Sequence, residues 1–472
     1  MSLMDVARGA YVRSPALLRR SLAPVLSLVP TSAKYGSTYR LWRQRIERAK
    51  TDLAFANNEH LAALRALLAK AHAGSPFYRD LIDRALGTGF DLSRLELDDL
   101  LALPVLRKEQ LQAAGDDVLA VPRSQVDRGD TSGSNGEKPF SFYLDKDRSV
   151  REIAFISDTW TRCGFTETDA KVVLRGVGID NQGKILHQYD PAMRELRVSA
   201  FPLLREHVAL YVDLIDKHQV RYIYGYPSAI EVMGRHMIEL RRRPRLPILG
   251  VMPISEPLYP HQRRTIEAAF GDAKIAHFYG LSEKAAFAEE LSREPDVYAF
   301  NPLYGLAELV DEDGQRITTP GVEGRLVSTG FLSTGMPFIR YDTEDRATLV
   351  ELPGDANGQR LKVRDLAPRR KPGFLITADG NRLVTVDFTP ESPRFFKGVD
   401  EYQFYQDTPG RSTIRYIPSP DGTHQDALNI ARDLEIRAQG RIAFDVERVA
   451  TLGSGRSGKR AFIDQRLDIS RY

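Results

Sequence analysis

A turn made of small hydroxyl residues and glycines is the sharpest chemical signal in the sequence. Its members are Thr131, Ser132, Gly133, Ser134, Asn135 and Gly136. Glycine lets the backbone approach an anion closely, and successive N–H groups and hydroxyls can then point at its oxygens. The glycine spacing before Lys138 differs from the Walker pattern. Composition alone therefore favours phosphate binding and a plain flexible turn equally.

A second group of candidate residues follows an expected strand at residues 274–278. Its members are Tyr279, Gly280, Leu281, Ser282 and Glu283. An aromatic ring can stack on a purine, a serine hydroxyl can donate to a phosphate, and a carboxylate can hold Mg²⁺ through oxygen. Ser255 and Glu256 follow another expected strand, at residues 246–254, in the same way. Parallel sheets bind ligands outside the carboxyl ends of their strands, so both groups occupy favourable places.

Two further residues carry useful groups but give weak signals by themselves. The carboxylate of Asp345 can accept two hydrogen bonds from ribose hydroxyls, although a turn aspartate is the simpler interpretation. Lys459 lies in a loop with three glycines and two serines. A lysine on such a loop can neutralise negative charge that develops on phosphate oxygens. Taken alone, a solvated surface lysine is the simpler interpretation there.

Alternating strands and helices would position these groups. Strands are expected at residues 172–174, 220–224, 246–254 and 274–278, and helices at 204–215, at 227–241 and before 270. This alternation predicts an α/β protein with a doubly wound, mostly parallel sheet. The first hundred residues read as helical, with leucines at spacings of three and four and Gly74 as a C-terminal cap.

The second half of the chain changes character. Residues 300–366 show short alternating segments, such as 306–310, 325–328 and 338–341, and predict a β-rich subdomain. A stretch rich in proline and arginine at residues 368–373 reads as a linker. The remaining residues predict a small α+β unit, with a hairpin turning at Asp379 and Gly380.

Composition limits the classes of protein that fit. The chain has 472 residues, and 66 basic against 63 acidic residues leave a net charge of +3, which argues against a protein that coats nucleic acid. The basic run at residues 241–245 reads as a solvated helix end. The single cysteine, Cys163, excludes an intrachain disulfide and fits a cytoplasmic location. No stretch predicts a transmembrane helix, and residues 14–30 read as an irregular arm, with weak surface attachment as the alternative.

Taken together and in order, these segments resemble the adenylate-forming ligases, in the phenylacetate–CoA ligase branch with its capsule-biosynthesis relatives. The resemblance covers nearly the whole chain. The matching segments are residues 103–108, the turn at 131–139 with the strand at 142–145, and residues 225–228, 255–258, 279–283, 337–345 and 457–459. One such motif is weak, whereas this many in the family's order form a strong signal.

The resemblance implies a large N-terminal domain that binds ATP and the acyl group, residues 1–368, and a mobile C-terminal lid, residues 369–472. It implies that residues 131–136 grip the ATP phosphates, that Glu283 binds magnesium, and that Lys459 swings in to catalyse adenylation. The remaining implied nucleotide contacts are Ser255, Glu256, Tyr279, Gly280, Ser282, Asp345 and Arg370. The implied acyl pocket comprises Tyr226, Pro227 and Ser228.

Several features depart from the family pattern. Asn135 replaces a hydroxyl residue, Glu344 replaces a glycine, and the hinge pattern around Arg370 is only half present. The implied activity is conversion of a carboxylic acid to its acyl adenylate, with ATP, Mg²⁺ and either coenzyme A or an amine or hydroxyl acceptor. Two alternatives stay open: an adenylyltransferase that stops at AMP transfer, and a nucleotide-binding pseudoenzyme. Neither the acid nor the oligomeric state follows from the sequence.

Overall fold

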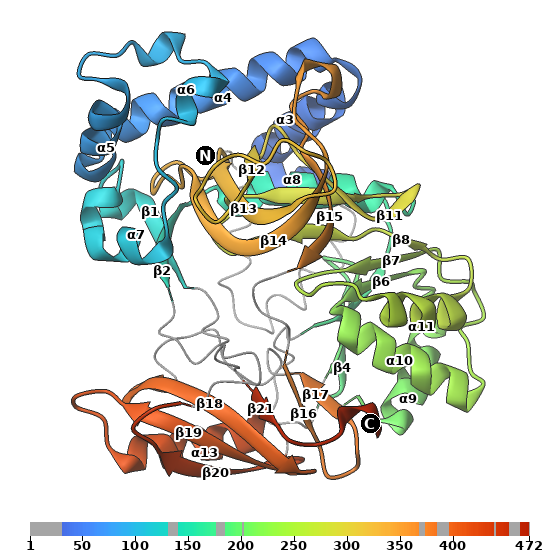
Figure 1. Ribbon diagram of the computed structural model, residues 1–472. Helices are drawn as coiled ribbons and strands as arrows, with labels where there is room; N and C mark the ends of the chain where they lie inside the picture. The colour runs from blue at the N-terminus through green and yellow to red at the C-terminus, as the bar shows by residue number, and fades with distance from the viewer. Residues whose placement is uncertain are drawn as a thin grey trace.

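The middle of the chain forms a six-stranded sheet in the computed structural model (Figure 1), which describes residues 31–130, 140–175, 185–200, 203–367, 373–384, 396–438, 440–452 and 463–471. Its strands are β3 (Lys171–Leu174), β4 (His187–Asp190), β5 (Glu195–Val198), β6 (Tyr222–Gly225), β7 (Gly250–Pro253) and β8 (Lys274–Ile275). Their order is β4-β5-β3-β6-β7-β8, and every pair is parallel except β4 with β5. The predicted parallel sheet is therefore confirmed.

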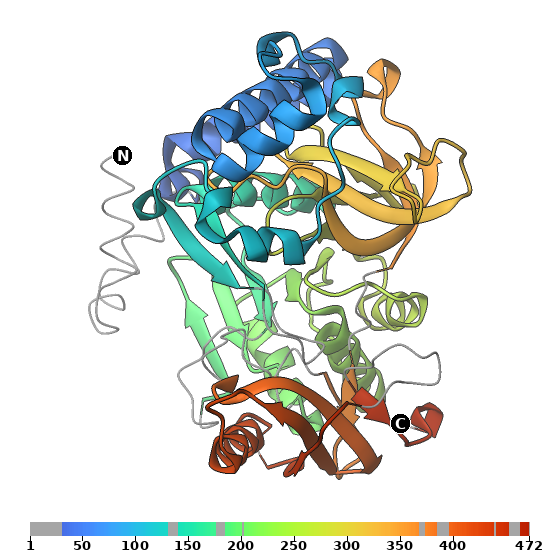
Figure 2. The same cartoon turned by 60° about the vertical axis from the view of Figure 1, so that its left-hand side comes forward.

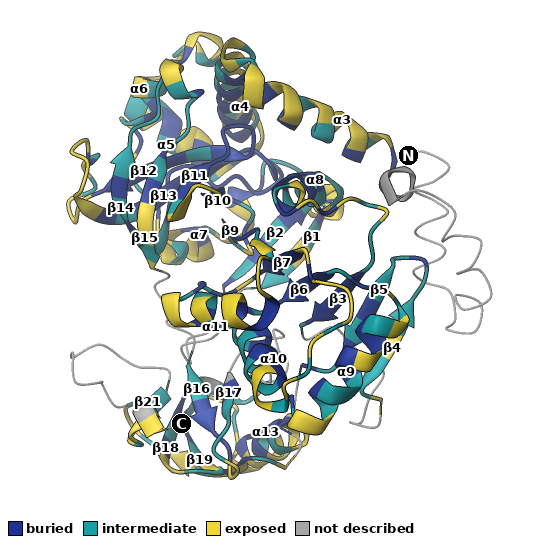
Figure 3. Ribbon diagram, turned by 90° about the vertical axis from the view of Figure 1, so that its right-hand side faces the viewer, coloured by how far each residue is buried: buried dark blue, intermediate teal, exposed yellow. Residues whose placement is uncertain are grey.

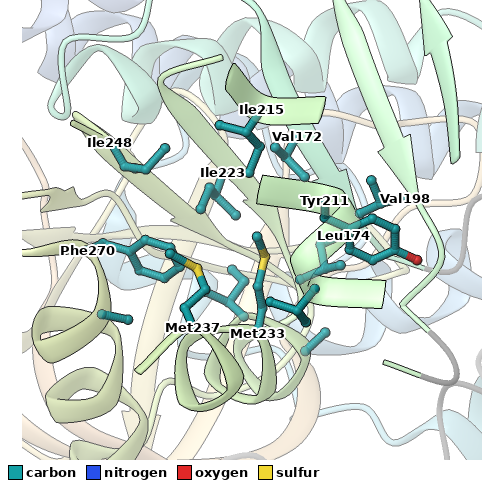
Figure 4. Close-up of a cluster of buried hydrophobic side chains, with 14 of the residues drawn as sticks. Val172, Leu174, Val198, Tyr211, Ile215, Ile223, Met233, Met237, Ile248 and Phe270 are labelled. Carbon is teal, nitrogen blue, oxygen red and sulfur yellow. The ribbon is translucent and has the colours of Figure 1, made fainter. Parts of the chain in front are cut away.

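Helices cover both faces of this sheet, because successive strand residues point to opposite sides. On one face, Val172, Leu174 and Ile223 pack against α9 (Arg205–Lys217), α10 (Pro227–Leu240) and α11 (Pro260–Phe270), and the methionines of α10 fill this core in Figure 4. On the other face, Val173 and Tyr224 pack against α8 (Arg148–Thr161) and α3 (Thr31–Thr51). Figure 3 shows buried residues along β6 and β7 and exposed ones along the outer sides of α3 and α11.

A second, antiparallel sheet of seven strands follows, as the β-rich prediction requires. In spatial order its strands are β12 (Gly305–Val310), β13 (Glu323–Gly330), β14 (Tyr341–Glu351), β15 (Lys362–Ala367), β11 (Glu294–Phe300), β10 (Phe287–Leu291) and β9 (Phe278–Gly280). Two predictions were wrong in detail. The single strand expected at 274–278 is split, so that β8 joins the parallel sheet and β9 the antiparallel one. The strand expected at 338–341 begins only at Tyr341.

Helices α4 (Leu53–Gly74) and α5 (Pro76–Leu86) lie at the N-terminal end of the described chain. Leu64, Leu67 and Leu68 are buried, as their spacing predicts. The helix ends at Gly74 as expected, but the capping residue is Ser75, whose backbone is extended, so the expected cap at Gly74 was wrong. Gly74 is instead needed for close packing, since a Cβ there would lie 2.2 Å from the carbonyl oxygen of Ala120.

The C-terminal part forms a separate four-stranded sheet, which Figure 2 shows below the rest of the molecule. Its strands are β18 (Val399–Thr408), β19 (Arg411–Pro418), β20 (Ala443–Arg448) and β21 (Ile463–Gln465), and α13 (His424–Arg437) packs on it. The hairpin predicted at Asp379 and Gly380 joins β16 (Phe374–Ile376) to β17 (Arg382–Val384). The N-terminal arm, most of the linker and the predicted domain boundary at residue 368 lie outside the described residues.

Polar interactions account for the basic run at the end of α10. Arg242 pairs with Asp213, and Arg243 donates a hydrogen bond to the carbonyl oxygen of Ala268 at 2.9 Å. This agrees with a solvated helix end. Among the described residues, no helix has the length and apolar character needed to cross a bilayer.

Candidate functional site

Two motif residues from distant parts of the sequence meet at the edge of the antiparallel sheet. Tyr279 lies in β9 and Asp345 in β14, and the tyrosine hydroxyl donates a hydrogen bond to Asp345 Oδ2 at 2.6 Å. Both side chains are buried. Burial and then the charge of Asp345 raise the pKa of Tyr279 well above its usual value, so the phenol stays protonated as a donor. The segments at 279–283 and 337–345 are therefore neighbours in space.

A second tyrosine holds the other candidate carboxylate. The hydroxyl of Tyr341, the first residue of β14, donates to Glu283 Oε1 at 3.1 Å. Burial and then the neighbouring Glu283 raise the pKa of Tyr341 well above its usual value. Glu283 is itself buried. The two carboxylates, Glu283 and Asp345, thus approach the same edge, each oriented by a tyrosine hydroxyl from the opposite segment.

Exposed residues alternate with these buried ones along the loop after β9. Gly280 and Ser282 are exposed between the buried Tyr279 and Glu283. A Cβ at Gly280 would meet nothing closer than 3.8 Å, so this position leaves open surface beside the loop. The Tyr279 ring packs edge-on against Phe300, with the ring centroids 6.0 Å apart. The backbone of Gly280 and the hydroxyl of Ser282 are consequently the accessible groups of this motif.

The parallel sheet contributes a buried carboxylate of its own. Glu256, after β7, accepts hydrogen bonds at 3.0 Å from both the backbone N–H and the hydroxyl of Ser228, in the first turn of α10. A negative group at a helix N-terminus satisfies donors that have no partner within the helix. Burial nevertheless outweighs these hydrogen bonds and raises the pKa of Glu256 to about 7.

The backbone around Glu256 is held in an unusual conformation. Ser255 is exposed and has a φ of +67°, a left-handed conformation that is uncommon for a residue other than glycine. The Nε2 atom of His277 lies 3.1 Å from the carbonyl oxygen of Glu256, and its Nδ1 atom lies 2.8 Å from the hydroxyl oxygen of Tyr298. Sequence reasoning missed both His277 and Tyr341. Their only signal was position in the chain, since Tyr341 lies inside the matching segment 337–345 and His277 comes two residues before Tyr279.

A cavity of about 120 Å³ lies between this region and the C-terminal part of the chain. Ser228, Glu256 and Tyr259 line it from the parallel sheet side, and Arg382 and Arg441 line it from the C-terminal side. Of the three residues assigned to the acyl pocket, Ser228 is among those lining this cavity. Pro227 is instead buried as the first residue of α10, and Tyr226 is the residue that precedes the helix.

The remaining candidates lie outside the described residues. They are Thr131, Ser132, Gly133, Ser134, Asn135, Gly136, Arg370 and Lys459. The strands that flank the serine–glycine turn, β1 (Val126–Asp130) and β2 (Ser141–Asp145), pair as an antiparallel hairpin. Phe140, immediately after the turn, stacks on Tyr341 with the ring centroids 6.3 Å apart. Because Tyr341 also donates to Glu283, Phe140 and this carboxylate contact the same tyrosine.

Comparison with known proteins shows what the whole chain is similar to. No family model matches the chain. Protein CapK of Staphylococcus aureus is 22% identical over 457 residues, which cover 96% of this chain and 98% of CapK. The chain is therefore similar to CapK over nearly its whole length, as the CapK-like branch of the predicted resemblance requires. The predicted resemblance is thereby confirmed.

Solved structures of 2-hydroxyisobutyryl-CoA ligase share the fold. The complex with 2-HIB-AMP and CoA in the thioesterification state has a TM-score of 0.54 and 19% identity, covering 89% of this chain and 91% of that one. An open conformation of the same ligase with these two ligands has a TM-score of 0.50 and 19% identity, covering 86% and 91%. The predicted fold class, a large α/β part with a smaller α+β part, is confirmed.

Proposed function

We propose that this protein is an ATP-dependent ligase that converts a carboxylic acid to its acyl adenylate and then transfers the acyl group to an acceptor. The observation that carries this proposal is the convergence of Tyr279, Glu283, Tyr341 and Asp345 at one sheet edge, through hydrogen bonds of 2.6 and 3.1 Å. Each carboxylate accepts a hydrogen bond from a neutral tyrosine hydroxyl, and the exposed Gly280 and Ser282 lie in the same motif as Tyr279 and Glu283.

The nucleotide would bind along this edge. A carboxylate has about four acceptor positions, so Asp345 can hold ribose hydroxyls while Oδ2 accepts from Tyr279. Ser282 would donate to the α-phosphate, and Ser255, Glu256, Tyr279 and Gly280 would surround the adenine. The turn at residues 131–136 would grip the phosphates, and Arg370 would complete the nucleotide contacts.

Magnesium would bind through Glu283. Among the residues that the structure describes, no cluster of three or more metal-ligating side chains occurs. This fits Mg²⁺, which is commonly bound through one or two carboxylates while phosphate oxygens and water fill the other positions. The buried carboxylate of Glu283 is a suitable hard oxygen ligand, and Tyr341 fixes the direction of one of its oxygens. When bound, the ion would supply positive charge to the phosphate oxygens.

The chemistry requires two displacements. A carboxylate oxygen of the substrate would attack the α-phosphorus of ATP, and the bond to the β-phosphate oxygen would break, which releases pyrophosphate. Lys459 would neutralise the charge that develops on the phosphorus centre. The acceptor would then attack the acyl carbon and lose its proton to solvent, and AMP would leave with the electrons of the single bond between the acyl carbon and the phosphate oxygen. Because a free carboxylate is a poor electrophile, the mixed anhydride makes this second attack possible.

The acceptor is proposed as coenzyme A or an amine or hydroxyl group. The similar 2-hydroxyisobutyryl-CoA ligase was solved with CoA, which supports the thiol. The similarity to CapK is the reason for proposing an amine or hydroxyl acceptor as the alternative, together with a role in capsule polysaccharide biosynthesis. Ser228, one of the predicted acyl-pocket residues, lines the same cavity as Arg382 of the C-terminal part, and we propose that the acceptor approaches through it.

Carboxylate-dependent exchange between ATP and pyrophosphate tests the proposal. A panel of aryl, fatty, hydroxy and amino acids is offered to the purified protein with Mg²⁺, and Asp345→Asn serves as the impaired variant. We expect exchange with at least one acid and a large loss in the variant. AMP transfer without any acid would indicate the adenylyltransferase alternative. ATP binding without any turnover, despite a complete panel, would indicate the pseudoenzyme.

A further inference from the structure

A cavity of about 450 Å³ lies on the N-terminal part of the chain, away from the groups assigned to the nucleotide. The segment at residues 101–107 forms one side, and the turn at residues 312–316 forms the other, with Arg325 and Arg340 between them. We call this cavity the arginine pocket. Its volume falls within the range of roughly 300–1,000 Å³ that is typical of small-molecule sites.

The start of β14 separates the arginine pocket from the candidate active site. Tyr341 reaches Glu283 through its hydroxyl, whereas the carboxylate of the next residue, Asp342, pairs with the pocket residue Arg325. Consecutive residues in a strand point to opposite faces. A molecule in the arginine pocket would therefore lie on the other side of the strand from the nucleotide.

The base of the pocket is rigid because its innermost arginine is fully engaged. Arg340 is buried and donates to both oxygens of Glu308 at 3.1 Å, and also to the carbonyl oxygens of Leu101 and Leu103 at 3.0 and 2.5 Å. Its φ of +46° is rare for a bulky residue, and such strain persists only where surrounding contacts enforce it. These contacts give the pocket a fixed shape before any ligand arrives.

Arginine is the commonest charged residue of the lining, which contains Arg107, Arg316, Arg325 and Arg340 with the carboxylates Glu312 and Asp313. Arg325 pairs with Asp342 and Arg340 with Glu308, so Arg107 and Arg316 are the two arginines left for a ligand. Glu312 is already engaged by Arg346 at 2.8 Å.

Two of the four guanidinium groups have donors to spare. Within the described residues, the side chains of Arg107 and Arg316 form no hydrogen bond or salt bridge. The Nε of Arg325 makes no hydrogen bond, although Glu312 lies 3.6 Å from it. A guanidinium group has five N–H donors, arranged in a planar fork that matches phosphate oxygens. Two such groups offer more donors than one carboxylate can accept.

We propose that the arginine pocket binds a phosphate-bearing small molecule, and that Arg107 and Arg316 are the residues that recognise its phosphate groups. The proposal does not depend on the activity proposed above, because it rests on other residues and another cavity. Guanidinium–phosphate pairs are charge-assisted and frequently bidentate, which gives both affinity and orientation.

Titration calorimetry at constant ionic strength tests the proposal, with inorganic phosphate and pyrophosphate as probes and citrate as the carboxylate comparison. A saturating non-hydrolysable ATP analogue with Mg²⁺ is present, so that the whole nucleotide site, including the part that would hold pyrophosphate, is filled. We expect pyrophosphate to bind the unmodified protein more tightly than citrate. The double variant Arg107→Ala/Arg316→Ala should weaken pyrophosphate binding at least tenfold.

A matched control is available in Arg264→Ala/Arg432→Ala, which removes two exposed arginines that line neither cavity. Equal loss in the control would mean general electrostatic attraction and would overturn the proposal, as would unchanged binding in the pocket variant. Citrate bound as tightly as pyrophosphate would overturn the assignment to phosphate. If the alanine variant fails to fold, Arg107→Lys/Arg316→Lys serves in its place, because it keeps the positive charges but loses the planar set of guanidinium donors. We expect this variant to bind pyrophosphate several-fold more weakly than the unmodified protein.

Discussion

Replacing Glu256 by glutamine should change how the stability of the protein depends on pH. The carboxyl group is buried and its pKa is raised from 4.5 to about 7, chiefly by burial. The folded protein therefore keeps this proton over a pH range in which the unfolded chain has lost it. A difference of that size corresponds to roughly 3 kcal/mol of unfolding free energy, since each pKa unit is worth about 1.4 kcal/mol.

The sign follows from the direction of the shift. The contribution of Glu256 to stability is fully present below pH 4.5 and is lost as the pH rises through about 7. Glutamine does not titrate, and its amide oxygen can still accept from the Ser228 N–H while its NH₂ group donates to the Ser228 hydroxyl oxygen. We expect the unmodified protein to lose roughly 3 kcal/mol relative to Glu256→Gln between pH 4.5 and pH 8.

Urea unfolding of both proteins at half-unit pH intervals measures this difference. Glu195→Gln is a suitable control, because burial raises the pKa of Glu195 but the charges of Lys171 and Arg197 outweigh it and lower the pKa overall. The difference in unfolding free energy between Glu195→Gln and the unmodified protein should stay constant above pH 5.5. The reasoning would be refuted if the difference in unfolding free energy between Glu256→Gln and the unmodified protein also stayed constant. It would be refuted as well if the unmodified protein became relatively more stable as the pH rises.

Three further substitutions have definite expected outcomes. Lys459→Ala should abolish adenylation while nucleotide affinity, measured by calorimetry, changes little, because the charge acts in the transition state; a normal rate would refute the role. Arg340→Met leaves Glu308 buried without its partner and should lower the free energy of unfolding, measured in urea, by about 3–5 kcal/mol. Adding Glu308→Leu to this variant should recover most of the lost stability. Gly225→Ala places a Cβ 2.2 Å from a backbone carbonyl oxygen and should destabilise by about 1–3 kcal/mol, whereas the open Gly354→Ala should not.

Local patterns were sufficient to predict the elements of the parallel sheet. The helix expected at 227–241 is α10, which begins with Pro227 at a position where its missing N–H costs nothing. The strand expected at 246–254 is shorter, since β7 begins only at Gly250. Pro247 lacks a backbone donor, so continuous strand pairing was less favourable there than the apolar residues suggested.

The contacts of the candidate site could not be predicted from local patterns. Tyr279 and Asp345 are 66 residues apart, and they meet only because the segment at 274–280 leaves the parallel sheet after β8 and joins the antiparallel sheet as β9. The apolar pattern of that segment is continuous, so nothing local marks the break. Local patterns also gave no sign that Glu256 caps α10. The N-cap residue in the sequence is Tyr226, which makes no capping hydrogen bond, and Glu256 comes from a distant segment.

The geometry of Glu344 bears on whether the departures from the family pattern matter. This residue, where the family has glycine, has a φ of +63°, the conformation that glycine adopts most easily. The backbone N–H of Glu344 donates to Asp342 Oδ1 at 2.9 Å, and its carboxylate lies 3.6 Å from the ammonium of Lys108. These contacts compensate for a strain of about 1–2 kcal/mol. The chain therefore follows the path that a glycine would give it, and Asp345 still meets Tyr279. The substitution alone is thus a weak reason to regard the protein as a pseudoenzyme.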